Sequence, residues 1–257
     1  MIVPTRALVA CDLNPKYLDF WPVVKKAWNE IIEIPVTLIL VADELPEHLK
    51  NDDSIILFKP LPNMYTAFQA QCIRNLYPAL LEKECGSIII SDMDMIPLDK
   101  TYFMKSMKET NFHIYRGIHP NIQQIWMCYC AATPLIWSQI FSCKTKSDVN
   151  EILIKWYKDS NYDNQRGSGW CTDQIQLYQH VLNANQLKQI ELQIETDQDT
   201  KFRHLDRIIP HEWINWNETL QTQLNHNVFT DFHMPEYQKY KDIIHRILDY
   251  CIFLNKK

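Results

Sequence analysis

Short apolar runs alternate with longer segments of helical spacing through the first half of the chain. Two segments, 21–32 and 64–83, carry apolar residues at helical spacing, and Pro78 predicts a break in the second. The runs that are too short for a helix and read as strands are 7–11, 36–42, 54–58 and 87–91. Buried strands separated by helices predict a parallel sheet that is covered on both faces.

The second half mixes aromatic-rich strands with helices. Strands are expected at 112–117, 124–134 and 189–195, and helices at 134–141, 149–159, 172–184 and 237–254. The helix at 172–184 is predicted to begin with Thr172 as its N-cap, after a loop at 165–170 that holds two of the four glycines. Because no repeat, low-complexity tract or linker interrupts the pattern, residues 1–257 are expected to form one domain.

Acidic residues stand where several of the predicted strands end. Asp12 and Asp43 each follow a strand, and Asp92 and Asp94 follow another with one residue between them. Ligands bind beyond the carboxyl ends of the strands in parallel sheets, which favours a binding site here. Two neighbouring carboxylates are costly unless a positive group lies between them, and their hard oxygens suit Mg²⁺ or Mn²⁺. A turn capped by the two carboxylates is the structural alternative.

Composition narrows the class of protein. The 257 residues are 46% hydrophobic and 22% charged, with a net charge of −5 and no basic run. This balance argues against a nucleic-acid partner bound through its phosphates, and it is compatible with a local positive patch for a diphosphate. Eight cysteines without a CxxC pair predict buried thiols in a reducing compartment rather than a zinc site. Neither a signal-peptide layout nor a membrane-spanning run is present, so a cytoplasmic location is expected.

The carboxylate pair carries a more specific likeness. The segment IIISDMDMIPL (88–98) resembles the DxD segment of nucleotide-sugar-dependent glycosyltransferases with the GT-A fold. The order of QAQCIRNLYPALL (69–81), GWCTDQ (169–174) and DFHMP (231–235) around it is similar too. The likeness spans roughly residues 5–235 and is closest to small glycosyltransferase domains of large DNA viruses, which implies a host cytoplasm.

The resemblance implies a fold and a reaction. The fold is a single α/β domain of GT-A (Rossmann-like) type, with a mixed, mainly parallel sheet flanked by helices. Residues 1–98 are then the nucleotide-binding half and residues 99–257 the acceptor-binding half. The reaction is metal-dependent transfer of a hexosyl or pentosyl group to a hydroxyl. The donor is a UDP-sugar in preference to a GDP-sugar, the acceptor is a glycan or glycoprotein, and the cofactor is Mn²⁺ or Mg²⁺.

The resemblance also assigns metal ligands. Asp94 is implied as the main ligand, and Asp92 as its partner, holding the ribose or a metal-bound water. His233 matches the downstream histidine that often completes the metal shell, and Asp231 is expected to orient it. For His233, an ordinary loop histidine is the alternative.

Further site residues follow from the same likeness. Asp173 is expected to bind the acceptor hydroxyl or to remove its proton, and with Asp94 it forms the catalytic pair. Trp170 is expected to stack on a sugar, whereas Trp126 and Trp213 are more typical of a core. The residues expected along the nucleotide are Ala10, Cys11, Asp12 and Arg74. A basic group could also supply one residue that holds the diphosphate; its members are Lys201, Arg203 and Arg207. For each of these three, a solvated surface position is the alternative.

Two other functions fit a strand followed by DxD. Phosphatases of the haloacid dehalogenase type use the first Asp as a nucleophile. They usually carry Thr or Val where this chain has Ile96, and their DxD lies near the N-terminus, whereas about a third of this chain precedes it. A non-catalytic module that binds a sugar nucleotide or a glycan is the third possibility.

Overall fold

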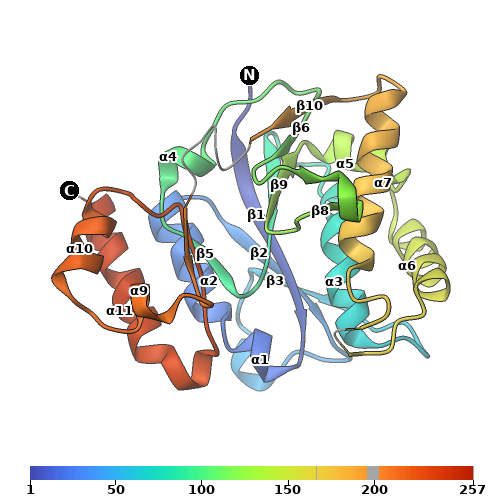
Figure 1. The fold of residues 1–257 in the computed structure, drawn as a ribbon. Helices are drawn as coiled ribbons and strands as arrows, with labels where there is room; N and C mark the ends of the chain where they lie inside the picture. Colours follow the sequence, from blue (N-terminus) through green and yellow to red (C-terminus); the bar gives the residue numbers. More distant parts are fainter. Residues whose placement is uncertain (166, 196–202, 257) are drawn as a thin grey trace.

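A seven-stranded sheet forms the centre of the computed structural model, which describes residues 1–165, 167–195 and 203–256 (Figure 1). In spatial order the strands are β10 (Glu191–Ile194), β6 (Asn111–Ile114), β9 (Tyr129–Ala132), β4 (Ser87–Ser91), β1 (Pro4–Asp12), β2 (Val36–Val41) and β3 (Ile55–Phe58). Neighbouring strands are parallel except at β9, which is antiparallel to both β4 and β6. The expected single α/β domain with a mainly parallel mixed sheet is therefore confirmed.

Helices cover both faces of this sheet (Figure 1). One face packs against α3 (Thr66–Leu76), α5 (Pro134–Phe141), α6 (Lys146–Ser160) and α7 (Thr172–Gln186), and the other against α2 (Trp21–Ala27) and α11 (Tyr237–Asn255). Successive residues of a strand point to opposite faces, so β1 supplies both cores. Leu8 and Ala10 join the first core, while Val9 and Cys11 join the second. The nearly continuous apolar run of β1 is thereby explained.

Two predicted helices change to another helix type near their C-terminal ends. Residues 21–32 form α2 followed by a π-helical turn, Trp28–Ile32, and the chain then turns at Glu33 with φ of 64°. Residues 64–83 form α3 followed by a 3₁₀ turn, Tyr77–Leu80, so the expected break near Pro78 is confirmed. Thr172 is not an N-cap. It is the first residue of α7, and its hydroxyl donates a 2.7 Å hydrogen bond to the carbonyl of Gly169.

The aromatic-rich strand expected at 124–134 is interrupted. Residues Gln124–Ile125 form β8, which pairs antiparallel with β7 (Ile118–His119), and the chain rejoins the main sheet only at β9. Trp126 leaves the strand and stacks on His119, with ring centroids 3.9 Å apart. The strand expected at 112–117 likewise ends at Ile114 as β6.

A second, smaller sheet was not predicted. It consists of β11 (His204–Asp206), β12 (Asp231–His233) and β5 (Met95–Pro97), with β12 in the centre. The pairing of Asp231 with Pro97 and of His233 with Met95 brings the DFHMP segment beside the DxD segment. Strands of three residues are too short for a readable alternation, which is why the pattern did not reveal them.

The remaining elements are short connections. They are α1 (Pro15–Leu18), α4 (Lys100–Phe103), α9 (Pro210–Trp213), α10 (Glu218–Asn225) and 3₁₀ turns at Glu47–Leu49 and Pro120–Ile122. Asp99 caps α4 by accepting hydrogen bonds from two backbone N–H groups, and Asn217 caps α10 in the same manner through Leu220. Within the described residues, no helix combines the length and the apolar character that crossing a membrane requires.

Candidate functional site

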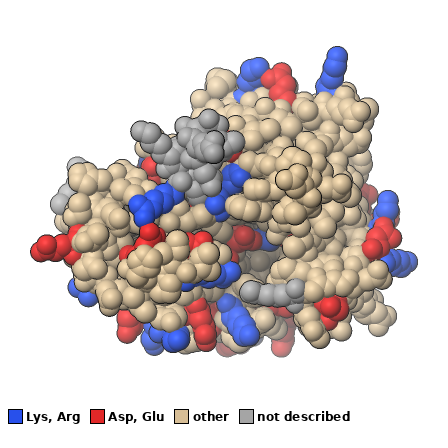
Figure 2. Space-filling model, in the orientation of Figure 1, with Lys and Arg blue, Asp and Glu red and all other residues tan. Residues whose placement is uncertain are grey.

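A cavity of about 270 Å³ lies where β1 and β4 end. These adjacent strands lie at the switch point of the sheet, because the chain extends from β1 to β2 and β3 on one side and places β4 on the other. Ligands of open α/β sheets bind at such a point, beyond the carboxyl ends of the strands. Figure 2 shows a hollow in this face with acidic and basic side chains at its margin.

Nine of the residues expected from the sequence to form the site line this cavity. They are Ala10, Cys11, Asp12, Arg74, Asp92, Asp94, Trp170, Asp173 and His233. The other strand-end carboxylate, Asp43, is exposed and is not among the lining residues. Trp126 and Trp213 also lie elsewhere, and Trp213 is buried in the core, as expected. Of the basic group, Arg207 lines the cavity and Arg203 does not, and Lys201 lies outside the described residues.

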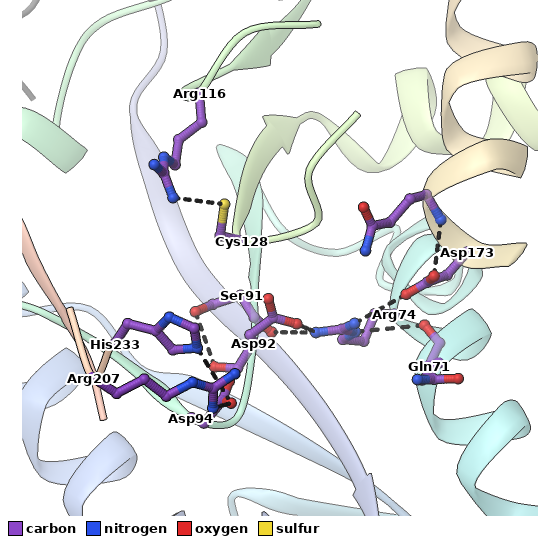
Figure 3. A network of polar contacts seen from close by, with 11 residues as sticks. Gln71, Arg74, Ser91, Asp92, Asp94, Arg116, Cys128, Asp173, Arg207 and His233 are labelled. Carbon is purple, nitrogen blue, oxygen red and sulfur yellow. Dashed lines mark hydrogen bonds and ion pairs between the residues drawn. The ribbon is translucent and has the colours of Figure 1, made fainter. Parts of the chain in front are cut away.

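Arg74 joins two carboxylates in the middle of the cavity (Figure 3). Its Nη1 donates to Asp92 Oδ1 and to the carbonyl of Ser91, and its Nη2 lies 3.2 Å from Asp173 Oδ2. Burial alone would lower the pKa of Arg74, but the charges of Asp92 and Asp173 raise it above its ordinary value. This guanidinium is therefore the positive group that offsets the electrostatic cost of placing Asp92, the first carboxylate of the DxD segment, close to other carboxylates.

Asp94 has a separate set of partners (Figure 3). Its Oδ2 accepts a 2.6 Å hydrogen bond from Arg207 Nη1 and lies 3.5 Å from His233 Nε2. Its backbone carbonyl accepts from the N–H of Met234, which ties the DxD turn to β12. Burial would raise the pKa of Asp94, but His233 and Arg207 lower it to about 2. The same contact with Asp94 outweighs burial at His233 and raises the pKa of the imidazole.

The carboxylate that orients His233 is Asp206 rather than Asp231. Asp206 Oδ1 lies 3.5 Å from His233 Nδ1, on the neighbouring strand β11. Asp231 is fully buried and binds His204 Nδ1 instead, so its expected contact with His233 is wrong. The pairing of β11 with β12 decides this, because it places Asp206 beside His233 and His204 beside Asp231.

Asp94 and His233 could hold a divalent cation together. Their facing atoms, Oδ2 and Nε2, are close enough for both to contact one ion, and Asp206 is placed to fix the ring. Among the described residues, no three His, Cys, Asp or Glu side chains gather as metal ligands, since Asp92 turns to Arg74. Mg²⁺ in phosphate-binding sites usually has one or two carboxylate ligands, with waters and substrate phosphates completing its shell. The residues present fit such an ion.

Asp173 forms the wall opposite His233. Its side chain is 4% exposed, Oδ2 contacts Arg74, and Oδ1 accepts a 2.9 Å hydrogen bond from the N–H of Gln174. Its backbone carbonyl accepts from Asn75, so α7 and α3 are fastened together at this point. Burial, only partly offset by Arg74, raises the pKa of Asp173 to about 6. A carboxylate with this pKa can exchange a proton near neutral pH.

The end of β1 forms a polar shelf at the other side of the cavity. Asp12 Oδ2 accepts from the hydroxyl of Thr66 at 2.8 Å, and Oδ1 accepts from the N–H of Asn14 at 3.0 Å. Cys11 is buried beneath it, and burial raises the pKa of its thiol. Trp170 lines the cavity near Asp173 and stacks on Tyr162, with centroids 6.3 Å apart.

Several lining residues were not predicted. They are Asn14, Tyr17, Ala67, Ala70, Gln71, Met93 and Gln174, and Asp206 was likewise missed behind His233. Gln174 stands inside the quoted GWCTDQ segment, and Asn14 and Tyr17 directly follow the strand-end Asp12, so adjacency was an available signal. Asp206 directly precedes the candidate Arg207, but its role depends on pairing with a strand whose His233 lies 27 residues later.

Comparisons with known proteins give similarity in structure only. No protein-family model matches the chain, and no curated protein is similar to it in sequence. Among solved structures, an active-site variant of LgtC has a TM-score of 0.49 at 9% identity, covering 95% of this chain and 94% of that one. The galactosyltransferase LgtC in complex with donor and acceptor sugar analogues has a TM-score of 0.47 at 9% identity, covering 96% of this chain and 95% of that one. The glycosyltransferase GlyE of Streptococcus pneumoniae TIGR4 has 0.49 at 10% identity, and the match covers 98% of this chain but 62% of GlyE.

Proposed function

We propose that this chain is a metal-dependent glycosyltransferase of GT-A type that moves a sugar from a nucleotide diphosphate donor to an acceptor hydroxyl. One observation carries the proposal: at the switch point of the sheet, a single cavity holds the DxD carboxylates with a different guanidinium on each. A donor of this class presents a nucleoside, two phosphates and a sugar in line. The cavity offers a different chemistry to each of these parts.

The nucleoside end is the shelf at the end of β1. Asp12 and Asn14 offer polar atoms to a ribose or a base, and Tyr17 offers an aromatic ring. Ala10 and Cys11 contribute backbone there, as the resemblance implies. A UDP-sugar is the proposed donor in preference to a GDP-sugar, on the grounds of that resemblance alone.

The diphosphate belongs beside Asp94, His233 and Arg207. Asp94 and His233 would hold Mn²⁺ or Mg²⁺, with Asp92 close by on Arg74. When bound, such an ion supplies charge that offsets the negative charge growing on the leaving nucleotide. Arg207 supplies a guanidinium of the planar shape that binds phosphate oxygens through two hydrogen bonds.

The sugar and acceptor belong between Arg74 and Trp170. Arg74 holds Asp92 and Asp173 at fixed positions around the transferred sugar, and Trp170 offers a ring to an apolar sugar face. Asp173 is the proposed group that binds the acceptor hydroxyl and takes its proton. Its raised pKa, about 6, supports this role, because the carboxylate is charged at neutral pH and its affinity for a proton is higher than usual.

The proposal also assigns a different role to each half of the chain. Residues 1–98 supply the nucleotide side of the cavity, and residues 99–257 supply Trp170, Asp173, Arg207 and His233. A glycan, free or on a protein, is the proposed acceptor. A cytoplasmic setting, the host's if the chain is viral, is supported by the cysteines, which are all free thiols and mostly buried.

A phosphatase of the haloacid dehalogenase type receives less support from the geometry. That reaction needs the first Asp of the pair to attack phosphorus. Asp92 is instead bound by Arg74, and the cavity lining includes residues from separate elements, among them Tyr17 on α1 and Gln174 on α7. No observation favours a module that binds without catalysis.

Ligand-dependent melting tests the proposal. UDP with Mn²⁺ is expected to raise the Tm by several degrees, more than either alone, because ligands that bind only the folded state stabilise it. Asp94→Ala should abolish the added effect of Mn²⁺, whereas Asp43→Ala, a strand-end carboxylate outside the cavity, should leave it intact. Stabilisation by phosphate or a phosphate mimic but by no nucleotide would favour the phosphatase. Nucleotide binding without hydrolysis or transfer of any donor in a nucleotide-sugar panel would favour the binding module.

A further inference from the structure

Arg207 is hydrogen-bonded to the oxygen of Asp94 to which a divalent cation would bind. Its Nη1 lies 2.6 Å from Asp94 Oδ2, and His233 Nε2 lies 3.5 Å from the same oxygen. A cation held jointly by Asp94 and His233 would take up its position between these two atoms. The guanidinium already supplies a positive charge to that carboxylate, and Figure 3 shows it lying against Asp94 beside the imidazole.

The backbone of Arg207 is fixed while its side chain is accessible. Arg207 directly follows β11, and its N–H donates a 3.0 Å hydrogen bond to the carbonyl of His233. The side chain of Arg207 is nevertheless 32% exposed, whereas that of Asp94 is 13% exposed. The guanidinium can therefore leave Asp94 by rotation of its stem, without any change in the strand pairing of β11 and β12.

Arg74 differs from Arg207 because its side chain is more buried and has more hydrogen-bond partners. Its side chain is 7% exposed, and it is bonded at once to Asp92, to Asp173 and to the carbonyl of Ser91. Displacing it would leave the buried carboxylate of Asp173 without its partner, which is strongly unfavourable, and would also free Asp92. Of these two guanidinium groups, Arg207 is thus the one that can be exchanged for another cation.

We propose that Arg207 is a competitor of the divalent cation: it holds Asp94 in the donor-free protein and releases it when a diphosphate arrives. This proposal rests on the proposed function, since it assumes a nucleotide diphosphate in the cavity. Phosphate oxygens bind a guanidinium through two parallel hydrogen bonds, so a diphosphate draws Arg207 away from the carboxylate. Asp94 would then be free to bind the cation, and a diphosphate offers oxygen ligands of the kind that such an ion takes.

Cooperative binding of metal and nucleotide follows from this exchange. Metal alone must displace Arg207 from Asp94 without giving the guanidinium a new partner, so it binds weakly. With the diphosphate present, that cost disappears, and by linkage the metal strengthens nucleotide binding by the same factor. Removing the guanidinium should therefore strengthen binding of metal alone while weakening binding of the nucleotide.

Titration of Mn²⁺ into the protein, with free Mn²⁺ read from its electron paramagnetic resonance signal, tests this directly. Arg207→Met keeps the apolar stem and removes the guanidinium. Without nucleotide, it is expected to bind Mn²⁺ about tenfold more tightly than the wild type, the factor that one charge-assisted hydrogen bond corresponds to. Addition of UDP should tighten Mn²⁺ binding strongly in the wild type and much less in the variant.

Arg203→Met is the matched control. Arg203 lies four residues earlier, pairs with Glu212, and does not line the cavity. Because this variant loses the same charge, unchanged Mn²⁺ affinity in it would separate competition at Asp94 from a general change in net charge. Arg207→Lys, which keeps charge and stem, provides a second variant if Arg207→Met fails to fold. Without nucleotide, Arg207→Lys should bind Mn²⁺ more tightly than the wild type, but by less than about tenfold.

The outcomes separate the two proposals. Equal or weaker Mn²⁺ binding by Arg207→Met, or an equal increase in Arg203→Met, overturns the competition. If no nucleoside diphosphate binds the wild type with or without metal, the proposed function fails. The comparison of Mn²⁺ affinities in the absence of nucleotide still decides whether Arg207 competes for Asp94.

Discussion

Arg74 and Asp173 are 99 residues apart in the sequence and form a buried ion pair, with Nη2 and Oδ2 3.2 Å apart. The pair joins α3 to α7 across the cavity, and Asp92 shares the same guanidinium. We expect Arg74→Met to lower the free energy of unfolding by about 3 kcal/mol, because it leaves the buried carboxylate of Asp173 without its cation and removes the partner of Asp92 as well. Urea unfolding followed by circular dichroism measures this loss.

The control for this prediction is Arg6→Met. Arg6 also pairs with a carboxylate, Glu84, but both side chains are more than 20% exposed. It should lose less than about 1 kcal/mol, as is usual for surface pairs. Adding Asp173→Asn to Arg74→Met should recover part of the loss, since it removes one of the uncompensated charges. Equal losses at Arg6 and Arg74 would contradict the assigned role of Arg74.

Asp173 should determine the acid limb of the pH–rate profile, that is, how the rate of transfer falls at low pH. Burial raises its pKa to about 6, so the carboxylate is charged above that pH and takes up a proton below it. If the charged form accepts the proton of the acceptor hydroxyl, the rate of transfer should fall as the pH drops through about 6. Asp173→Asn should be much slower and should lack this limb. An unchanged limb in the variant would assign the titration to another group.

The central strands of the main sheet were predictable because they are buried on both faces. In β2 and β4 every residue is buried, so each appears in the sequence as a nearly continuous apolar run. The direction of β9 was not predictable, since an antiparallel strand buried on both faces has the same composition as a parallel one. The small sheet escaped because its strands are three residues long.

The site was predictable where a residue belongs to a local pattern. Asp92 and Asp94 stand at the end of a strand, and Asp173 lies in the first turn of a helix after a glycine-containing loop. Contacts were not predictable. Nothing in the sequence indicates that Arg74 takes Asp92 while Arg207 takes Asp94, or that Asp206 rather than Asp231 faces His233. These choices depend on strand pairing and on helices that are distant in the sequence.

Asp206 should control metal affinity through His233. A carboxylate that holds the second ring nitrogen of a metal-binding histidine fixes its orientation, and losing it usually weakens metal binding at least tenfold. Asp206→Asn is expected to weaken Mn²⁺ binding in the presence of UDP by about tenfold. The amide oxygen can still accept the hydrogen bond that Asp206 Oδ1 receives from the N–H of Ile208, so the turn is preserved. Asp43→Asn serves as the control, and an equal effect there would refute this role.

Asp52 should contribute to stability in a pH-dependent manner. Burial would raise its pKa, but hydrogen bonds from Lys25 and from the indole of Trp21 lower it below its ordinary value. A carboxylate whose pKa is lower in the folded state stabilises the fold above its unfolded pKa, about 3.9, and loses this contribution as the pH falls further. The wild type should therefore lose stability below about pH 4 more steeply than Asp52→Asn. Unfolding followed by tryptophan fluorescence measures the difference, and parallel curves would exclude the contribution.

Gly169 should be irreplaceable in the loop that carries Trp170. Its φ is +73°, and a Cβ there would meet the carbonyl of Ser160 and the Cα of Tyr162, both at 2.8 Å. We expect Gly169→Ala to cost about 2 kcal/mol of stability, because the conformation and the close backbone both oppose a side chain. Gly167→Ala in the same loop should cost much less, since its Cβ would approach only the side chain of Asp163. Displacement of Trp170 in Gly169→Ala should also weaken sugar-donor binding relative to UDP, measured by calorimetry. Equal behaviour of the two variants would show that the backbone at Gly169 does not position Trp170.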